Sequence, residues 1–310
     1  MSLSAHTSRT ARLRARAAIY QALRAWFVDQ GLLELHIPPL ASEAIPEDHI
    51  DLFAFDGAVL MASPEIAMKQ ALADGLGSCF TMGPAFRRGE AGRLHRPCFD
   101  MLEWYRVGGG LGELAADVQA LVATACAAAA RVCPTLAPAA PTWEHLDLCQ
   151  LVQDRAGWDP ATAYQQDRFD LTLVDVIEPY LATRAGVLLG RWPAAQASLA
   201  RLDPDDPHRA LRLEAYWGGV ELANGFVELQ DPLLQRRRFQ AANAVRQAHD
   251  LPVLPLPDQF LASLPDLPAC AGMALGLDRL VMLATGAADI GDVLAYDPFL
   301  PQPRGPRRNP

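Results

Sequence analysis

Residues 270–283 read CAGMALGLDRLVML, and this stretch decides the fold. Its first half is built of small residues, which predicts a strand that a helix can approach closely, and its second half is apolar enough for a packed helix. Arg279 stands near the start of that helix. Between glycines and an apolar run an arginine is well placed to hold a phosphate, although an arginine there is more often a surface residue.

Upstream of this stretch, residues 79–86 and 98–107 predict two strands joined by a polar loop, and together they form a long hairpin. Successive side chains of a strand point to opposite faces, so Phe99, Glu103 and Tyr105 share one face. An acid and a phenol on one sheet face need a ligand or each other. A solvent-facing sheet with scattered charges is an equally good interpretation of this segment alone.

A third segment, residues 218–229 (GGVELANGFVEL), embeds acids in an apolar run. An extended chain places Asn224, Phe226 and Glu228 on one face, with Glu221 on the opposite face unless a bulge intervenes. Carboxylates and a carboxamide beside glycines suit Mg²⁺ or an ammonium group. The alternative is an edge strand with solvated acids, which the surrounding apolar residues disfavour.

The remaining patterns predict the fold class. Helices are predicted at residues 7–30, 111–132, 145–156, 171–181, 206–216 and 232–248 and after Ser63-Pro64-Glu65, and strands at 32–37, 51–55, 58–61 and 187–192. Glu214, a further acid, falls in the predicted helix 206–216. Strands separated by helices of irregular length, with a hairpin among them, indicate an α+β fold: a largely antiparallel β-sheet flanked by helices rather than repeated βαβ units.

The amino-acid composition limits the classes of protein to which the chain can belong. The 310 residues are 51% hydrophobic and carry a formal charge of −9, which excludes a disordered chain and argues against a partner held by phosphate neutralisation. The longest apolar run, around residues 120–132, falls short of the roughly 20 residues that span a bilayer, so we expect no membrane. Six scattered cysteines are typical of buried thiols in a reducing cytoplasm. Lys69 is the only lysine, which we attribute to a genome that favours Arg and Ala codons.

Taken in order, these segments resemble the three signature motifs of class II aminoacyl-tRNA synthetases of the lysine branch. The predicted helix 7–30 with the strand after it resembles the first motif, residues 86–105 resemble the second and residues 272–282 the third. Within that branch the chain is most similar to the lysyl-tRNA synthetase paralogues that charge elongation factor P. The stretches that carry the likeness are MASPEIAMK, FRRGEAGRLHRPCFDMLEWYR, PAAQASLA, GVELANGFVEL and AGMALGLDRLVMLATGA.

This resemblance implies the domain organisation. Residues 1–310 would form a single catalytic domain with a small helical insertion at about 112–186. No anticodon-binding domain is expected, because the chain before the strand of the first motif has room for one helix only. The first motif implies a homodimer, and the whole enzyme would work in the cytoplasm.

The resemblance also implies the role of each candidate residue. Arg87 and Arg279 would be catalytic. ATP would be bound by Arg87, Glu90, His95, Phe99 and Arg279, with the adenine between Phe99 and Arg279. The amino acid would be bound by Glu65, Glu103, Tyr105, Asn224, Phe226, Glu228 and Ala274, and Mg²⁺ by Glu214 and Glu221.

The reaction implied is ATP-dependent activation of (R)-β-lysine, or lysine, as an adenylate and transfer to a lysine side chain of elongation factor P. Ala274 stands where lysyl-tRNA synthetases generally carry glycine, and its methyl group would disfavour α-lysine. Two departures concern ATP: Gly89 replaces the acid of the second motif, and Arg96-Pro97-Cys98 replaces Asn-Pro-Glu. The alternatives are a truncated lysyl-tRNA synthetase and a non-catalytic paralogue that binds amino acid and ATP; tRNA is not the expected partner.

Overall fold

An eight-stranded sheet forms the centre of the molecule in a computed structural model that describes residues 5–297, so residues 1–4 and 298–310 of the predicted domain lie outside the described part. Its strand order is β1-β5-β6-β11-β10-β9-β8-β7. The strands are β1 (Leu33–Glu34), β5 (Cys79–Phe86), β6 (Cys98–Val107), β7 (Trp143–Asp147), β8 (Gly186–Pro193), β9 (Arg209–Trp217), β10 (Val220–Val227) and β11 (Cys270–Gly276). The two edge pairs are parallel and the inner pairs antiparallel, which confirms the predicted α+β class.

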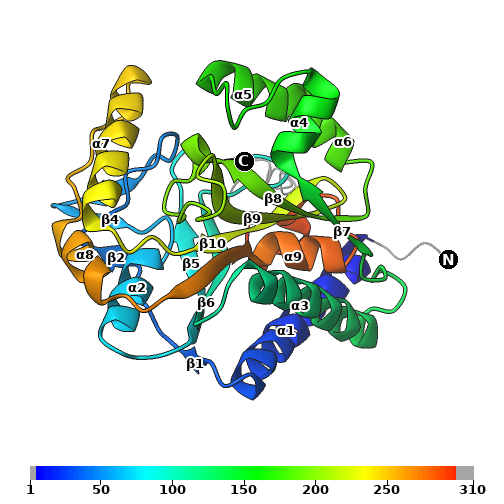
Figure 1. The fold of residues 1–310 in the computed structure, drawn as a ribbon. Helices are drawn as coiled ribbons and strands as arrows, with labels where there is room; N and C mark the ends of the chain where they lie inside the picture. Colours follow the sequence, from blue (N-terminus) through cyan, green and yellow to red (C-terminus); the bar gives the residue numbers. More distant parts are fainter. Residues whose placement is uncertain (1–4, 298–310) are drawn as a thin grey trace, which may run out of the picture.

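Three helices cover one face of this sheet: α1 (Ala5–Asp29), α3 (Leu111–Val132) and α9 (Leu277–Ala284) (Figure 1). Alternation along β6 sends Leu102 and Trp104 into this layer, where both are fully buried. Phe27 of α1 stacks on Phe80 of β5 with ring centroids 4.6 Å apart. The opposite face of β6 therefore carries Glu103 and its neighbours.

Helix α3 corrects one sequence argument. It is 22 residues long and, by length and composition alone, could cross a membrane, so the inference from a short apolar run was wrong. Within the described residues, however, α3 contributes side chains such as Leu121 and Val122 to the main hydrophobic core. The helix is accounted for by packing against the sheet.

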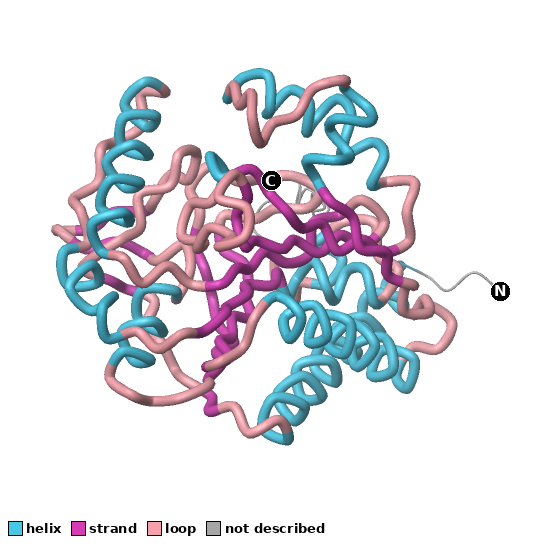
Figure 2. Tube along the Cα trace, in the orientation of Figure 1, coloured by secondary structure: helices cyan, strands magenta, loops and turns pink. Residues whose placement is uncertain are grey.

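The other elements lie at the ends and on the far face of the sheet. On the left of Figure 1 are α2 (Glu65–Ala73), α7 (Pro232–Ala248) and α8 (Asp258–Ser263), with a small sheet of β2 (Leu40–Ala41), β4 (Ala58–Leu60) and β3 (Phe53–Phe55). Near β7 and β8 lie α4 (Leu148–Ala156), α5 (Gln166–Thr172), a π-helical turn at Leu173–Ile177 and α6 (Glu178–Leu181) (Figure 2). Short 3₁₀ turns occur at Ala194–Gln196, Leu264–Asp266 and Ile290–Val293.

Two predicted helices were wrong in whole or in part. Residues 206–216 are not helical: Arg209–Trp217 form β9, paired on both sides by β8 and β10. Its alternation of apolar Leu213 and Ala215 with polar neighbours is the strand period that the sequence analysis overlooked. The helix predicted at 145–156 begins only at Leu148, because the preceding residues form the edge strand β7.

The segment that we expected to form a helical insertion, residues 112–186, contributes to two different hydrophobic clusters. Helix α3 belongs to the main core, whereas α4, α5 and α6 pack around Phe169 and Ile177 in a hydrophobic cluster of their own against β8. The part of residues 112–186 that stands apart from the main core thus begins at Leu148.

Candidate active site

A cavity of about 880 Å³ lies on the sheet face opposite α1, α3 and α9. This volume is typical of ligand-binding sites, which span roughly 300–1,000 Å³. Every predicted site residue except Glu214 lines the cavity, as do residues of α7 and of the loop 194–199. One continuous space thus contains both the predicted ATP residues and the predicted amino-acid residues.

Strand register explains why residues far apart in sequence meet here. Two neighbouring rows of paired residues cross the central strands β6, β11, β10 and β9. The first row runs Glu103, Ala274, Asn224 and Glu214, and the second runs Tyr105, Gly272, Phe226 and Arg212. Because the rows are two residues apart along each strand, their side chains point to the same face.

A β-bulge places Glu221 on this face. The register between β10 and β9 shifts between Glu221 and Ala223, so Glu221 pairs with Tyr216 while Asn224 pairs with Glu214. Tyr216 and Glu214 are two residues apart on β9 and share a face, so their partners do too. The bulge is the exception that the sequence analysis had named.

Gly272 makes room for the polar groups of the second row. A methyl group at this position would lie 2.3 Å from Cε1 of Tyr105 and 2.8 Å from Oε1 of Glu228. Ordinary contacts between non-bonded carbons are about 3.5–4.0 Å, so a side chain here would push both groups aside. The absence of a side chain at position 272 lets the phenol and the acid converge.

At one end of the cavity Glu103 is held in a fixed orientation. Its Oε2 accepts a hydrogen bond from Ser63 Oγ at 2.6 Å and its Oε1 accepts one from the Tyr105 hydroxyl at 2.7 Å. Glu103 is 2% exposed. Burial, reinforced by the nearby carboxylate of Glu65, raises the pKa of Glu103 to about 7.

The ammonium group of Lys69 lies between two of the predicted substrate acids. It forms ion pairs with Glu65, one helical turn earlier on α2, and with Glu228 Oε2 at 2.5 Å. Its Nζ also lies 5.1 Å from the centre of the Phe226 ring. Burial lowers the pKa of Lys69, but the carboxylates of Glu228 and Glu65 outweigh it and raise the pKa above its ordinary value.

Two acceptor atoms at the same end lack a partner. Among the described residues neither Asn224 Oδ1 nor Glu228 Oε1 has a hydrogen-bond donor, although both atoms are buried. An unsatisfied buried polar group destabilises a protein by about 1–3 kcal/mol. Such acceptors in a cavity wall are where the donors of a ligand, such as ammonium groups, would bind.

Arginines line the other end of the cavity. Arg279 donates to the carbonyl of Glu221 at 2.8 Å, and its Nη2 lies 2.5 Å from Nε2 of His95. Burial and the adjacent Arg279 lower the pKa of His95, which favours a neutral imidazole. The Arg87 guanidinium carbon lies 5.3 Å from the centre of the Phe99 ring, so Arg87, rather than Arg279, lies over this ring in the structure.

The two departures from the second motif have structural correlates. Gly89 adopts a left-handed φ of 82°, a conformation that strains other residues, and the next residue, Glu90, lines the cavity 3.9 Å from Arg87. Arg96 is 6% exposed and forms an ion pair with Asp297 at 2.6 Å, which ties the motif to the end of the described chain.

The predicted Mg²⁺ ligands differ in position. Glu221 lines the cavity with its side chain 43% exposed. Glu214 is buried behind the cavity wall, where its carboxylate accepts hydrogen bonds from Arg212 at 2.6 Å and from the Tyr216 hydroxyl at 2.5 Å. Burial raises the pKa of Glu214 to about 7 and Glu221 adds to the rise, so a cation between the two acids would be stabilising.

The described residues hold no group of three His, Cys, Asp or Glu side chains that could chelate a metal alone. Two carboxylates are nevertheless the donor set of an Mg²⁺ ion that takes its other ligands from water and phosphate oxygens. The residues present therefore fit an ion that arrives with a nucleotide.

Several residues of the site were not predicted from the sequence. They are Glu47, Ser63, Lys69, Arg212 and Arg238. The sequence contained a signal for two of them. Glu65 and Lys69 are four residues apart on a predicted helix, where such side chains can pair, and Ser63 stands at the start of that helix. For Glu47 there was none: burial raises its pKa, and Arg246 Nη1 fixes its backbone by donating to its carbonyl at 2.7 Å.

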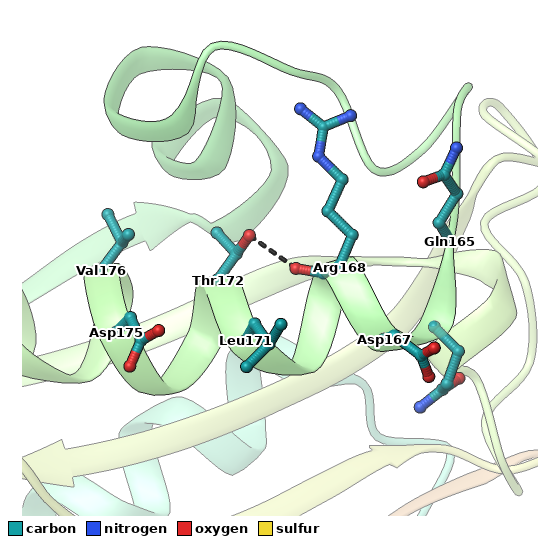
Figure 3. A pocket seen from close by; sticks show the side chains of 8 residues that line it. Gln165, Asp167, Arg168, Leu171, Thr172, Asp175 and Val176 are labelled. Atoms are coloured by element: carbon teal, nitrogen blue, oxygen red, sulfur yellow. Dashed lines mark hydrogen bonds between the residues drawn. The ribbon is translucent and has the colours of Figure 1, made fainter.

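A second pocket lies on the surface of α5 and the π-helical turn, where Gln166 lines both this pocket and the large cavity (Figure 3). Its wall is essentially one helix, where Leu171 is 63% exposed and the hydroxyl of Thr172 bonds back to the carbonyl of Arg168. No convergence of charged groups from several strands occurs there, so we assign the chemistry to the large cavity.

Comparison with known proteins gives a consistent picture. The family model described as tRNA synthetases class II (D, K and N) matches residues 1–298. Proteins named elongation factor P–(R)-β-lysine ligase are similar along most of the chain. That of Klebsiella pneumoniae (strain 342) is 36% identical over 91% of this chain and 93% of its own. Those of Yersinia enterocolitica and Vibrio cholerae are 37% and 35% identical, over 92% and 94% of this chain and 94% and 97% of their own.

Proposed function

Because the chain belongs to the class II tRNA synthetases (D, K and N) and, within them, to the family of elongation factor P–(R)-β-lysine ligases, we propose that it activates (R)-β-lysine, or lysine, with ATP and transfers it to a lysine side chain of elongation factor P. It is an ATP-dependent ligase. All six cysteines are free thiols, which supports a reducing cytoplasm as its location.

One observation carries the choice of substrate. Glu65, Glu103 and Glu228 lie close enough to raise one another's pKa, while Arg279 contacts His95 and Glu221 and Arg87 lies over Phe99, and all of these residues line the same cavity. A lysine-type amino acid is positively charged at two amino groups and negatively charged at its carboxylate, and ATP is negatively charged. The charge distribution of the cavity therefore matches an amino acid of this type beside a nucleotide.

The residues support a two-step reaction. In the first step the substrate carboxylate attacks the α-phosphorus of ATP and pyrophosphate leaves, which requires positioning and charge neutralisation rather than a nucleophilic side chain. Arg87, with Nε buried and without a partner among the described residues, and Arg279 supply this positive charge. Mg²⁺ held by Glu221 and Glu214 would neutralise further phosphate charge. In the second step the acceptor amine attacks the activated carbonyl and AMP leaves.

The preference for the β-amino acid is proposed to depend on Ala274. This residue lies between Glu103 and Asn224 in the first row and lines the cavity. Its methyl group narrows the floor of the pocket at the place where glycine would leave space. One methyl group in a pocket discriminates by about 1–3 kcal/mol, enough to favour one position of the amino group.

A homodimer is proposed through the N-terminal segment. Val28 at the end of α1 is 57% exposed and Leu33 of the edge strand β1 is 51% exposed. Leu40, at the edge of the small sheet, is 54% exposed. Apolar side chains beside an open strand edge suit a second copy of the chain. Light scattering coupled to size exclusion gives the mass directly, and a monomer at micromolar concentration would contradict the proposal.

Intact mass spectrometry tests the proposed activity. The purified protein is incubated with ATP, elongation factor P and either lysine or (R)-β-lysine, and the factor is weighed. We expect one added aminoacyl group that depends on ATP. Arg279→Gln should abolish the addition, and Arg237→Gln, an exposed arginine outside the cavity, is the matched control that should retain it. No added mass with either amino acid would reject the proposal.

The same protein separates the two alternatives. A truncated lysyl-tRNA synthetase would charge tRNA, which acid-gel electrophoresis detects. A non-catalytic paralogue would be well folded but would not catalyse amino-acid-dependent exchange between ATP and pyrophosphate.

A further inference from the structure

The single lysine of the chain is buried directly behind the wall of the substrate cavity, against Glu65 and Glu228, which line it. Lys69 is 1% exposed on α2, and every other cationic side chain apart from histidine is an arginine. A buried ammonium is costly unless it is paired, because burial removes its hydration. The structure pairs it with two carboxylates from different elements, Glu65 on α2 and Glu228 directly after β10.

These two acids are also predicted substrate ligands, so Lys69 and the substrate share them. The shared arrangement is asymmetric. Glu228 Oε2 forms an ion pair with Lys69 Nζ at 2.5 Å, whereas Glu228 Oε1 has none, and neither oxygen has a hydrogen bond of regular geometry among the described residues. One oxygen of Glu228 therefore bonds to the protein, and the other is available to a ligand. Lys69 thus holds one oxygen of a carboxylate that lines the cavity.

The charges of the pocket give a second reason for this lysine. Burial raises the pKa of Glu103 to about 7 and that of Glu228 to about 8, so both acids become fully ionised only when positive groups bind beside them. With Glu65, Glu103 and Glu228 all ionised there are three negative charges, and Lys69 cancels one of them, which leaves two. Two is the number of ammonium groups on lysine or β-lysine. Without Lys69, closely spaced buried carboxylates could not all remain ionised, and one of them would take up a proton.

We propose that Lys69 is a positioning residue whose ammonium group orients Glu65 and Glu228 and sets the charge of the pocket to match a substrate with two ammonium groups. This proposal rests on the proposed function, which supplies the substrate. The groups that face Lys69 are Glu65 on its own helix, Glu228 after β10, Glu103 on β6, Cys270 on β11, and the rings of Phe226 and Phe260.

A further consequence concerns the acyl transfer itself. An ammonium has no lone pair, and that of Lys69 is held between Glu65 and Glu228 behind the cavity wall, so it is not placed to attack a carboxyl group activated in the cavity. The enzyme thus keeps its one lysine side chain from competing with the acceptor lysine of its partner.

The first test needs no substrate and no variant. Because the chain has one lysine, selective ¹³C labelling of lysine gives a single Cε resonance in NMR. We expect this resonance to show no titration up to about pH 10.5, the pKa of an ordinary lysine, because Lys69 stays protonated above it. A resonance that titrates at or below this pH would overturn the proposal.

The second test compares Lys69→Met, Lys69→Arg and Met68→Ala. Met68 is the matched control because it is fully buried on the same helix and, like Lys69, does not line the cavity, but it carries no charge. Without Lys69 the buried acids destabilise the fold where they are ionised. The gap in unfolding temperature between wild type and Lys69→Met should therefore widen as the pH rises from about 5.5 to 8.5, and the gap for Met68→Ala should not. A gap for Lys69→Met that is independent of pH would contradict the proposal.

Exchange kinetics provide the third test. In Lys69→Met the KM for lysine should rise roughly 10- to 100-fold and fall again with rising pH more steeply than in wild type, with the KM for ATP little changed. Lys69→Arg, which keeps the charge, should recover part of the affinity. An unchanged KM in a folded Lys69→Met protein would refute the role of Lys69, whereas absence of exchange in wild type would refute the proposed function instead.

Discussion

Replacing Gly272 by alanine probes the geometry of the second row. The new methyl group would lie 2.3 Å from Cε1 of Tyr105, and an ordinary carbon contact requires about 3.5 Å, so the ring must retreat by about 1 Å. Tyr105 is 2% exposed and its hydroxyl donates to Glu103 at 2.7 Å. A displacement of this size breaks that hydrogen bond and moves Glu228 as well.

The expected magnitude follows from these contacts. Forcing an extra methyl group into a packed site destabilises a protein by about 1–3 kcal/mol, and losing a hydrogen bond to a charged group weakens binding by about 1.5–3 kcal/mol. At 1.4 kcal/mol per factor of ten, the KM for lysine should rise roughly 10- to 100-fold. The KM for ATP should change little, because Arg87 and Arg279 line the other end of the cavity.

Exchange between ATP and pyrophosphate measures both KM values, and thermal unfolding reports the change in stability. Gly83→Ala is the matched control: Gly83 lies on β5, and a methyl group there would meet nothing within 4 Å. If Gly272→Ala binds lysine as tightly as wild type, the amino acid does not bind beside Tyr105 and Glu228, and the assignment of this end of the cavity is wrong.

Three further predictions concern pH, metal and specificity. Because the pKa of Glu103 is raised to about 7, its carboxyl becomes protonated as the pH falls below 7 and no longer attracts an ammonium; the KM for lysine should rise towards acid pH, and a flat profile between about pH 6 and 8 would contradict this. Glu221→Gln should raise the Mg²⁺ concentration needed for half-maximal exchange by roughly tenfold, and an unchanged requirement would remove Glu221 from the metal site. Ala274→Gly should raise kcat/KM for α-lysine relative to (R)-β-lysine by about tenfold, and an unchanged ratio would exclude Ala274 from specificity.

Part of the active site could be predicted from local patterns in the sequence. The strand period of β6 predicts that Phe99, Glu103 and Tyr105 share a face, and all three line the cavity. The strand-to-helix stretch that contains Arg279 was likewise predicted with its bounds, because small residues and an apolar helix are local features. The family resemblance added the expected partners of these residues, since it identifies which segments act together.

Other features depend on pairing partners that are distant in the chain. The sequence analysis predicted a helix around Glu214. In the structure this segment is the strand β9, which pairs with β8 on one side and with β10 on the other. The sequence analysis stated that a bulge would bring Glu221 to the face of Asn224, but it could not predict that the bulge occurs. A bulge is defined by the pairing with a neighbouring strand, which the local sequence does not show. Lys69 was attributed to codon usage, since its partner Glu228 lies on another element.

The amino-acid sequence by itself determined which segments form the hairpin, the last strand and the last helix, and which residue types they present. These features follow from backbone periodicity and the size of side chains, which act over a few residues. Tertiary structure alone decided that Lys69 forms ion pairs with Glu65 and Glu228 and that Gly272 leaves room for Tyr105. Both depend on contacts between elements that meet only after folding, because a steric contact and a short ion pair are set by interatomic distances that only the folded chain fixes.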